Sequence, residues 1–454
     1  MKQLLTIILL LSAICSTGQK SQSVTVKATT GVLNVAAKSG QSLKIQVNGK
    51  LIYQQGVQIL PPEPPKVLYL KDFSDWRIAF NTAITDSVIL QGETMEIQSD
   101  CIPEQQVPID GDLVLQGTPE KPLVITCNFR EGIDKPTHSL YLGAGKHLFK
   151  NVIFKKTGSN TFGSCIQTTQ ADITYHNTFE NCKWEGDWAY NYQSTMGHGS
   201  STFVDCNMFA IIGNIHYFSQ LGSKDLIIKN TFVKSLTSHN IYSHAWNNYY
   251  VDGLTSLGSG INAFNSYYTN NTGQFKSTYQ SFKNCKNAEG ALSKQTNASP
   301  MWRLQSVGSR IAVENSDLPV YEWNRDIDLV NTNTSNKGNG TPIYGNSAAL
   351  NSTGDLTAMD SLTILSSNLT SLIGWHNSTI TAIGTTVKFT TLKPGNYLFK
   401  NCNMGDVELQ GDGVKVTFEN CKFSSQYKAI RLFGKVGSMD LISFIGNTYP
   451  IATY

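Results

Sequence analysis

The sequence predicts an all-β protein whose main part is a right-handed parallel β-helix, a solenoid of stacked coils, preceded by a small β module. A six-residue pattern, apolar-x-Asn-Cys-x-apolar, recurs along the chain. Its period of about 19 to 32 residues suits one solenoid coil and is too short for a globular domain. Charged residues make up only 15 % of the chain. Abundant Asn, Ser, Thr and Gly favour turn-rich β structure over helices.

The repeat itself dictates how its copies pack. Its apolar residues face one side of a short strand, and the Asn tolerates the left-handed backbone of a sharp turn. A single coil cannot bury that side alone, so coils must stack about 4.8 Å apart in parallel pairing. An antiparallel sandwich is the alternative, but it does not require the same polar residue in every strand. Copies with cysteine span residues 179–184, 203–208, 282–285, 399–404 and 418–423; looser copies span 149–154, 228–232, 250–254, 313–316 and 444–447.

The repeat also predicts the state of the cysteines. Those within it are expected to be buried thiols, because stacked side chains that point in parallel have poor disulfide geometry. Cys101, Cys127 and Cys165 lie outside the repeat and are the better bridge candidates. There is no C-x-x-C pair, so the sequence gives no support for structural zinc.

The first residues indicate export. Lys2 precedes an apolar run over residues 4–15, and small residues follow, so we predict a signal peptide over 1–18. The protein is then expected to be secreted, periplasmic or on the cell surface. Lipidation of Cys15 is an alternative, although Ile14 stands where a small residue is expected. The run over residues 4–15 is too short to span a membrane, and no other stretch is long and apolar enough to do so.

Three further segments complete the predicted organisation. Residues 19–60 form the small β module, in which Asn48-Gly49 between alternating strands signals a hairpin. Residues 61–70 contain four prolines and form a stiff linker. The parallel β-helix with its N-terminal capping helix takes residues 71–454. Within it, residues 331–352 are poor in apolar side chains and are predicted to be a long loop or a poorly ordered coil.

The start of the solenoid carries a family resemblance. Ser74 or Asp75 can cap a helix over residues 76–84, after which come a strand at 88–90, Gln91-Gly92 and a strand ending at Gly117. This order resembles the opening of the pectate lyase-like right-handed parallel β-helix superfamily, over roughly residues 70 to 450. Gln91 stands where the superfamily has Pro or Ala, and the Gly-rich segment before the first strand is missing. The resemblance implies a fold rather than an activity, because the superfamily includes lyases, hydrolases, esterases, phage tailspikes and adhesins.

Enzymes of that superfamily bind linear polymers along a lateral groove, and the region 184–268 is rich in suitable groups. Aromatic rings pack on sugar faces, while His, Asn and acids bond hydroxyl groups. The alternative is that these rings fill the core. The substrate-binding candidates are Trp184, Trp188, Tyr190, His239, Trp246 and Tyr250.

The first pair of catalytic candidates is Tyr242 and His244. A strand of period two places Asn240, Tyr242 and His244 on one face, where the last two could act as acid and base in β-elimination. Hydrogen-bonded surface groups are the alternative. Gly197-His198-Gly199 matches a polygalacturonase tripeptide, but the paired carboxylates that such hydrolases need are missing.

The second pair is Lys294 and Arg303. Glu289 five residues before Lys294, with Arg303 and Arg310 following, faintly resembles the calcium-dependent polysaccharide lyases of family 6. That resemblance implies calcium as the cofactor, with the metal acidifying the proton beside a uronate carboxylate. The arginine spacing and the further calcium-binding acids do not match, and solvated coil charges are the alternative.

The partner class follows from charge and composition. A net charge of +3, scattered along the chain, does not suit a nucleic-acid surface. We therefore expect an exported β-helix that binds an extracellular polysaccharide, with lyase or glycoside hydrolase activity as the enzymatic form. The rival is a non-catalytic adhesin or a tailspike-like rod, for which a trimer is expected.

Overall fold

The computed structural model describes most of the chain in two compact units, Met1–Lys66 and Val67–Tyr454. The described residues are 44–47, 50–54, 66–99, 107–129, 137–158, 163–168, 173–194, 197–217, 224–244, 248–258, 262–267, 279–288, 301–304, 310–318, 324–334, 341–424, 430–433 and 442–448. No helix in these ranges is long and apolar enough to cross a membrane.

The first unit contains a β-hairpin. Strands β1 (Lys44–Val47) and β2 (Lys50–Gln54) pair antiparallel, with Val47 opposite Lys50. Two residues, Asn48 and Gly49, separate the strands, so the predicted hairpin is confirmed. The predicted signal peptide, Cys15 and the proline run lie outside the described residues.

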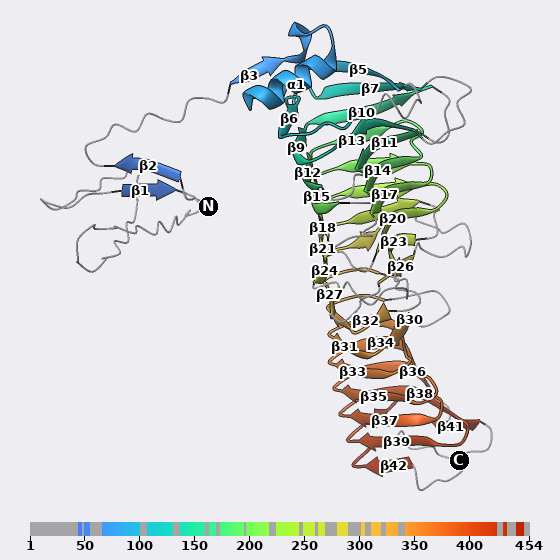
Figure 1. Cartoon of the computed structure of the whole chain (residues 1–454). Coiled ribbons are helices and arrows are strands. Elements are labelled where there is room, and N and C mark those ends of the chain that lie inside the picture. Colours follow the sequence, from blue (N-terminus) through green and yellow to red (C-terminus); the bar gives the residue numbers. More distant parts are fainter. Residues whose placement is uncertain are drawn as a thin grey trace, which may run out of the picture. The chain divides into compact units, whose positions relative to one another are not determined.

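The second unit is a parallel β-helix, which confirms the predicted fold class. One sheet, here called sheet I, runs along its whole length, and every pairing in it is parallel (Figure 1). In order its strands are β3 (Val67–Tyr69), β4 (Ile89–Gln91), β6 (Leu113–Gln116), β9 (Gly145–Lys150), β12 (Thr174–Glu180), β15 (His198–Val204), β18 (Lys224–Lys229), β21 (Asn248–Asp252), β24 (Gln280–Lys283), β27 (Ile311–Glu314), β29 (Ile327–Val330), β31 (Asn346–Leu350), β33 (Ser361–Leu365), β35 (Ser378–Ile383), β37 (Gly395–Lys400), β39 (Val414–Glu419) and β42 (Ile442–Ile445).

Two further parallel sheets complete the coils of the N-terminal part. Sheet II contains β5 (Thr94–Ser99), β7 (Leu123–Phe129), β10 (Val152–Thr157), β13 (Lys183–Glu185), β16 (Asn207–Ala210), β19 (Phe232–Ser235), β22 (Thr255–Gly258) and β25 (Lys286–Asn287). Sheet III contains β8 (Thr137–Tyr141), β11 (Gly163–Thr168), β14 (Tyr190–Ser194), β17 (Gly213–Tyr217), β20 (His239–His244), β23 (Asn262–Tyr267) and β26 (Met301–Arg303). From β6 onward, each of these coils therefore passes through sheets I, II and III in turn.

The C-terminal coils are shorter, and one sheet takes the place of sheets II and III. Sheet IV contains β28 (Asn324–Arg325), β30 (Thr341–Tyr344), β32 (Thr353–Ala358), β34 (Asn368–Gly374), β36 (Thr386–Leu392), β38 (Asn403–Gln410), β40 (Lys422–Phe423) and β41 (Ile430–Phe433). Of the two alternatives predicted for 331–352, the long loop is wrong for the described part, because β30 and β31 lie there and belong to a coil. The coil is short enough to need few apolar side chains, and Ile343 and Ala349 suffice as its buried residues.

A left-handed corner follows each strand of sheet I from β9 onward, as the repeat predicted. Asn151, Asn181 and Asn420 have φ of 53°, 51° and 52°. Asn tolerates this conformation because its short polar side chain bonds locally. The side-chain amide of Asn181 donates to Oδ1 of Asn151 at 2.8 Å, which links one coil to the next.

The repeat residues on either side of the corner form the core. Phe179 is fully buried and stacks between Phe149 and Phe203, with ring centroids 5.2 and 5.0 Å apart. Cys182 and Cys206 follow the corner and are buried free thiols. The bridge candidates Cys127 and Cys165 are also free and buried, whereas Cys101 lies outside the described residues.

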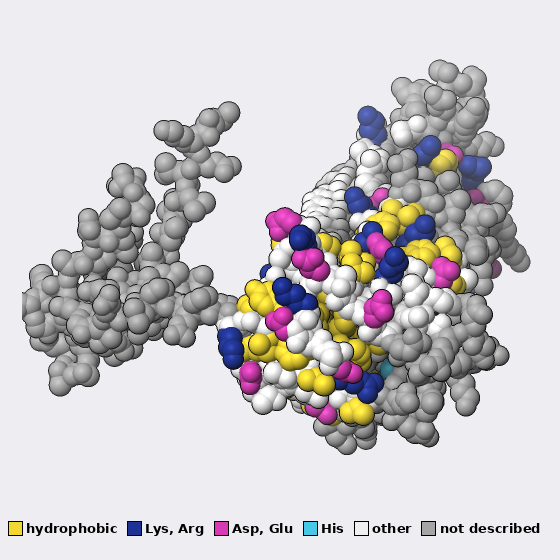
Figure 2. All heavy atoms as spheres, turned by 90° about the horizontal axis from the view of Figure 1, so that it is seen from above, with side chains coloured by type: hydrophobic (Ala, Val, Ile, Leu, Met, Phe, Trp, Pro, Cys, Tyr) yellow, Lys and Arg dark blue, Asp and Glu magenta, His cyan; other side chains and the backbone are white. Residues whose placement is uncertain are grey.

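A helix covers the N-terminal end of the stack (Figure 1). Helix α1 (Trp76–Asp86) begins at Asp75, whose carboxylate accepts the backbone N–H of Arg77 at 2.6 Å. Phe80 and Ala83 are buried, so the predicted capping helix is confirmed. A short 3₁₀ turn, η1 (Leu70–Asp72), precedes it, and β3 already pairs with β4. The solenoid thus begins before the predicted boundary at residue 71. Figure 2 views the molecule from above this end and shows acidic and basic side chains interspersed with apolar ones.

A polar cluster is buried between the end of sheet III and the start of sheet I. The hydroxyls of Tyr175 and Ser194 are 2.7 Å apart, and Nζ of Lys224 donates to Ser194 Oγ at 3.0 Å. Nζ also lies 4.6 Å from the centre of the Tyr217 ring. Lys224 is fully buried, and burial lowers its pKa from 10.5 to about 7. The core of the solenoid therefore holds an ionisable amine.

Candidate functional site

The outward face of sheet III carries aromatic and polar side chains. One row in strict register runs along it: Tyr141, Gln167, Gln193, His216, Tyr242, Asn265 and Arg303. All but Asn265 are half-buried, whereas the residues just before them, such as Tyr192, Ile241 and Trp302, are fully buried. We call this set the outer row.

Four rings form a continuous contact on this face, here called the ring row. Tyr190 stacks on His216 with centroids 5.1 Å apart, His216 meets Tyr242 at 5.3 Å, and Tyr242 stacks on His239 at 5.0 Å. Gly213 pairs with Tyr190 and leaves space for its ring. A Cβ at Gly213 would lie 3.4 Å from that ring and 2.8 Å from the carbonyl oxygen of His239. Because the rings cover one another's faces, they offer a ligand their edges, hydroxyls and ring nitrogens.

The electrostatics of the face keep the imidazoles of His239 and His138 neutral. Burial, and to a smaller extent the charge of Arg303, lowers the pKa of His239 to about 4. Burial likewise lowers the pKa of His138 to about 4 and raises that of Tyr190. None of the residues in the seven strands of sheet III is an aspartate or a glutamate. The face therefore offers neutral donors and acceptors together with one full positive charge, Arg303.

The structure brings together four of the predicted site residues: Tyr190, His239, Tyr242 and Arg303. Two others do not belong to the site. Trp184 and Trp188 are only 1 % and 0 % exposed, so neither ring can contact a sugar. Trp184 stacks on Phe154 in the core at 5.0 Å, and the Trp188 indole N–H points to the carbonyl oxygen of Phe154.

The remaining predicted residues lie elsewhere or outside the described part. Tyr250 is 40 % exposed on the outer face of sheet I, where it stacks on Tyr279 at 5.0 Å. That is a different face from the ring row. The side chain of His244 is outside the described residues, as are Trp246 and Lys294.

The expected alternation along β20 is wrong at one position. Asn240 was predicted to share a face with Tyr242, but it is 1 % exposed, like its neighbour Ile241. Its side chain completes a buried amide ladder, in which Asn191 donates to Asn214 at 2.7 Å and Asn214 donates to Asn240 at 3.1 Å. Asn240 and Ile241 are thus two consecutive buried residues, and the rings of His239 and Tyr242 on either side of them stack on the outside.

Sequence reasoning missed most of the outer row. His138 and Tyr141 lie before the region that the sequence favoured, and their rings are 5.4 Å apart. Gln167, Gln193 and Asn265 carry no motif. The only signal was the position of each residue within its coil, and that position can be assigned only when the register of sheet III is known.

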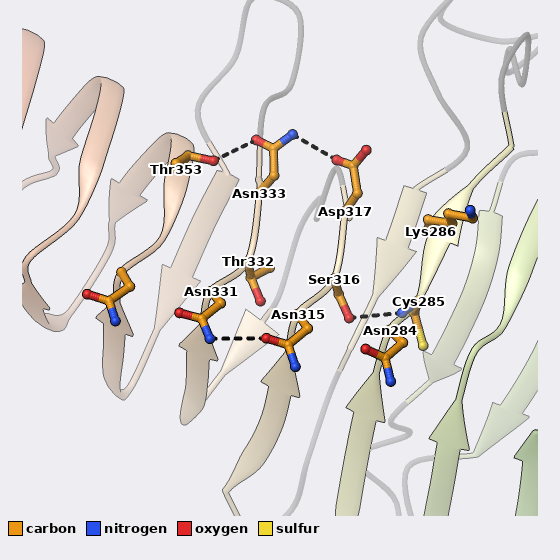
Figure 3. Close-up of a pocket in the computed structure, with 11 residues that line it drawn as sticks. Asn284, Cys285, Lys286, Asn315, Ser316, Asp317, Asn331, Thr332, Asn333 and Thr353 are labelled. Carbon is orange, nitrogen blue, oxygen red and sulfur yellow. Dashed lines mark hydrogen bonds between the residues drawn. The ribbon is translucent and has the colours of Figure 1, made fainter. Parts of the chain in front are cut away.

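A concave region lies along the left-handed corners of sheet I, where the long coils give way to the short ones (Figure 3). This hollow of about 510 Å³ is lined by polar side chains that bond one another. Asn331 donates to Asn315 at 3.0 Å, Asn333 donates to Asp317 at 2.8 Å, and Thr353 donates to Asn333 at 3.2 Å. These bonds run from coil to coil, so the hollow is explained by the stacking of the corner.

Metal binding has no support among the residues that the structure describes. No three His, Cys, Asp or Glu side chains gather there in a way that could hold an ion. The segment 289–294, whose resemblance implied calcium, lies outside these residues.

Comparisons with known proteins give structural matches alone. No family model matches the chain, and no curated protein matches its sequence. Tailspike protein 3 of bacteriophage CBA120 is 10 % identical with a TM-score of 0.38, over 86 % of this chain and 62 % of the tailspike. The catalytic domain of a GH87 α-1,3-glucanase in complex with nigerose is 11 % identical with a TM-score of 0.33, over 86 % of this chain and 70 % of that domain. The A-module of a mannuronan C-5 epimerase from Azotobacter vinelandii is 12 % identical with a TM-score of 0.23, over 85 % of this chain and all of the module. The chain thus spans less than two thirds of the tailspike.

Proposed function

We propose that the protein is exported and that the outward face of sheet III binds an extracellular polysaccharide along the solenoid axis. The observation that carries this proposal is the ring row, in which Tyr190, His216, Tyr242 and His239 present hydroxyls and ring nitrogens on three successive coils. Gln193, which is half-buried, extends the same face with an amide. Such edges suit sugar hydroxyls, which both donate and accept hydrogen bonds.

Arg303 narrows the substrate class. It is the only residue of the seven strands of sheet III that carries a full charge at neutral pH, and its guanidinium suits a carboxylate. We therefore propose a polysaccharide that contains uronic acid. Burial lowers the pKa of His239 and of His138, so these two imidazoles are neutral and add no competing positive charge.

The enzymatic form of this proposal is β-elimination. In that reaction a base takes the proton from the carbon beside the uronate carboxylate, and the bond from the ring to the glycosidic oxygen breaks, leaving an unsaturated sugar. A neutral His239 can accept a proton and the phenol of Tyr242 can donate one. Glycoside hydrolysis requires a carboxylate pair, which the strands of sheet III do not contain.

A non-catalytic rod, adhesive or tailspike-like, is the second candidate. The same lack of acidic residues on sheet III favours it, because the face then offers binding groups without the usual pair of catalytic carboxylates. Both candidates share the binding site and differ only in turnover.

Binding is tested by titrating uronic-acid and neutral oligosaccharides into the full-length protein in a calorimeter. Tyr242→Ala and Arg303→Ala should each weaken binding at least about tenfold. Tyr250→Ala is the matched control, since it removes an exposed tyrosine from another face, and it should leave affinity within about twofold. Equal losses in all three variants, or no binding across the panel, would refute the assignment.

Turnover is tested on the same panel with and without calcium. Absorbance of unsaturated products would support the lyase, and new reducing ends without that absorbance would point to hydrolysis. Binding with neither signal would assign the protein to the non-catalytic class.

A further inference from the structure

The outer face of sheet I carries an apolar stripe in the region of the short coils. Val330, Leu350, Leu365 and Ile383 follow one another in register on successive strands. Leu350, Leu365 and Ile383 are 38 %, 37 % and 37 % exposed, although the residues just before them are buried. Isolated exposed aliphatic residues are ordinary, but a contiguous row of them on a flat sheet is typical of an interaction surface.

An ion pair closes each end of the stripe in the same register. Lys283 pairs with Glu314 at 3.0 Å on the N-terminal side, and Lys400 pairs with Glu419 at 2.8 Å on the C-terminal side. The ladder joins these residues to the stripe, because Glu314 precedes Val330 and Lys400 follows Ile383. Along the axis the order is therefore Lys, Glu, four aliphatic residues, Lys, Glu.

When a second copy of this order runs in the opposite direction, each Lys lies opposite a Glu and each aliphatic residue lies opposite another aliphatic residue. We propose that the face docks against the same face of a second copy of the chain, with the two solenoid axes antiparallel. A two-fold axis along the strands then places Lys283 opposite Glu419 and Glu314 opposite Lys400. The aliphatic residues meet one another, with Val330 opposite Ile383 and Leu350 opposite Leu365.

The next outward-facing row of sheet I is compatible with this antiparallel pairing. Two residues before the stripe on each strand stand Ala312, Asp328, Ala348, Thr363, Thr381 and Leu398. Under the same axis Ala348 faces Thr363, Asp328 faces Thr381 and Ala312 faces Leu398. These side chains are mostly small, and no like charges oppose each other.

Charge also selects the antiparallel arrangement over the parallel ones. In a parallel pair, or in a three-fold spike around a common axis, each level of one solenoid meets the same level of the next. Lys283 would then face Lys283, and Glu314 would face Glu314. Like charges brought together at an interface are unfavourable.

The expected affinity is modest. Eight coils at about 4.8 Å and strands of four or five residues give a face of roughly 34 by 16 Å, or about 550 Å² per copy. Stable interfaces bury about 800 Å² per partner. We therefore expect a monomer–dimer equilibrium that must be measured over a range of concentrations.

Sedimentation of the full-length chain and three variants tests the register. Lys400→Glu should raise the dimer dissociation constant at least about tenfold, because two glutamates would then face each other. Glu314→Lys should do the same. The double variant restores opposite charges across the antiparallel interface and should recover the wild-type constant, whereas a parallel interface would still oppose like charges. Thermal unfolding of each variant separates loss of the dimer from loss of the fold.

Cysteine cross-linking provides a second readout. Under mild oxidation, mixed Val330→Cys and Ile383→Cys chains should form the heterodimer in preference to either homodimer. Preferential homodimers would overturn the antiparallel arrangement. A monomer at every concentration would overturn the interface itself.

Discussion

Lys224→Met should remove a pH dependence from the stability of the solenoid. The ammonium of Lys224 is fully buried, and its pKa falls from 10.5 to about 7 because burial disfavours the charged form. Below pH 7 the amine is charged in both the folded and the unfolded state, so the whole penalty of burying the charge is present. Above about pH 10.5 it is neutral in both states, and the penalty disappears. Between these limits the unfolded chain binds more protons, so stability rises with pH.

The magnitude follows from the two pKa values. The full penalty is about 5 kcal/mol, and the part recovered between pH 7 and pH 9.5 is about 3 kcal/mol. Met has a similar length and no charge, and its thioether suits the neighbouring Tyr217 ring. In the variant the Ser194 hydroxyl keeps its hydrogen bond to Tyr175, while the Ser194 backbone carbonyl loses the bond that it accepts from Lys224 at 3.3 Å.

Urea unfolding at several pH values, followed by circular dichroism, measures this effect. The free energy of unfolding of the wild type should rise by about 3 kcal/mol more than that of Lys224→Met between pH 7 and pH 9.5. Lys229→Met is the control, since Lys229 is exposed on the same strand. Parallel pH curves for the wild type and Lys224→Met would refute the reasoning.

Three shorter predictions test the repeat and the site. Phe179→Ala should lower the free energy of unfolding by about 3–5 kcal/mol, because the ring is fully buried between Phe149 and Phe203, and a loss below 1 kcal/mol in urea titrations would contradict this. Asn181→Ala should lower the free energy of unfolding by about 1–2 kcal/mol, because φ at this residue is 51°. Asn181→Gly should lower it by less. The opposite ranking in thermal melts would be inconsistent with the left-handed corner. Glycan affinity should be constant between pH 6 and 8, because the pKa of His239 is about 4, and calorimetry showing a titration in that range would exclude neutral His239 from the site.

Much of the fold could be predicted because one local pattern repeats. The Phe–x–Asn–Cys order specifies an inward ring, a left-handed corner and a second inward residue, and stacking then follows from burial. The repeat also indicates that Trp184 is buried. Trp184 occupies the last apolar position of the repeat, where other copies have Phe154 and Met208, and all three are buried.

The site was harder to predict because it depends on sheet III. Each coil reaches this sheet after a connection of different length, so residues aligned in space are not evenly spaced in the sequence. Tyr190 and His216 stack, yet no motif relates them. The burial of both Asn240 and Ile241 also breaks the period of two, and the side chain of Asn240 is held inside by the amide ladder.

Because sheet I is continuous, whole coils can be removed or inserted, either by design or in evolution. Corners such as those at Ser366 and Gly384 have the same left-handed backbone, and the strands that precede them share one register. Excising residues 366–383 would join two equivalent points and let β33 pair with β37 in place of β35. The chain could therefore gain or lose whole coils, while the ring row, which lies far along the solenoid axis, keeps its geometry.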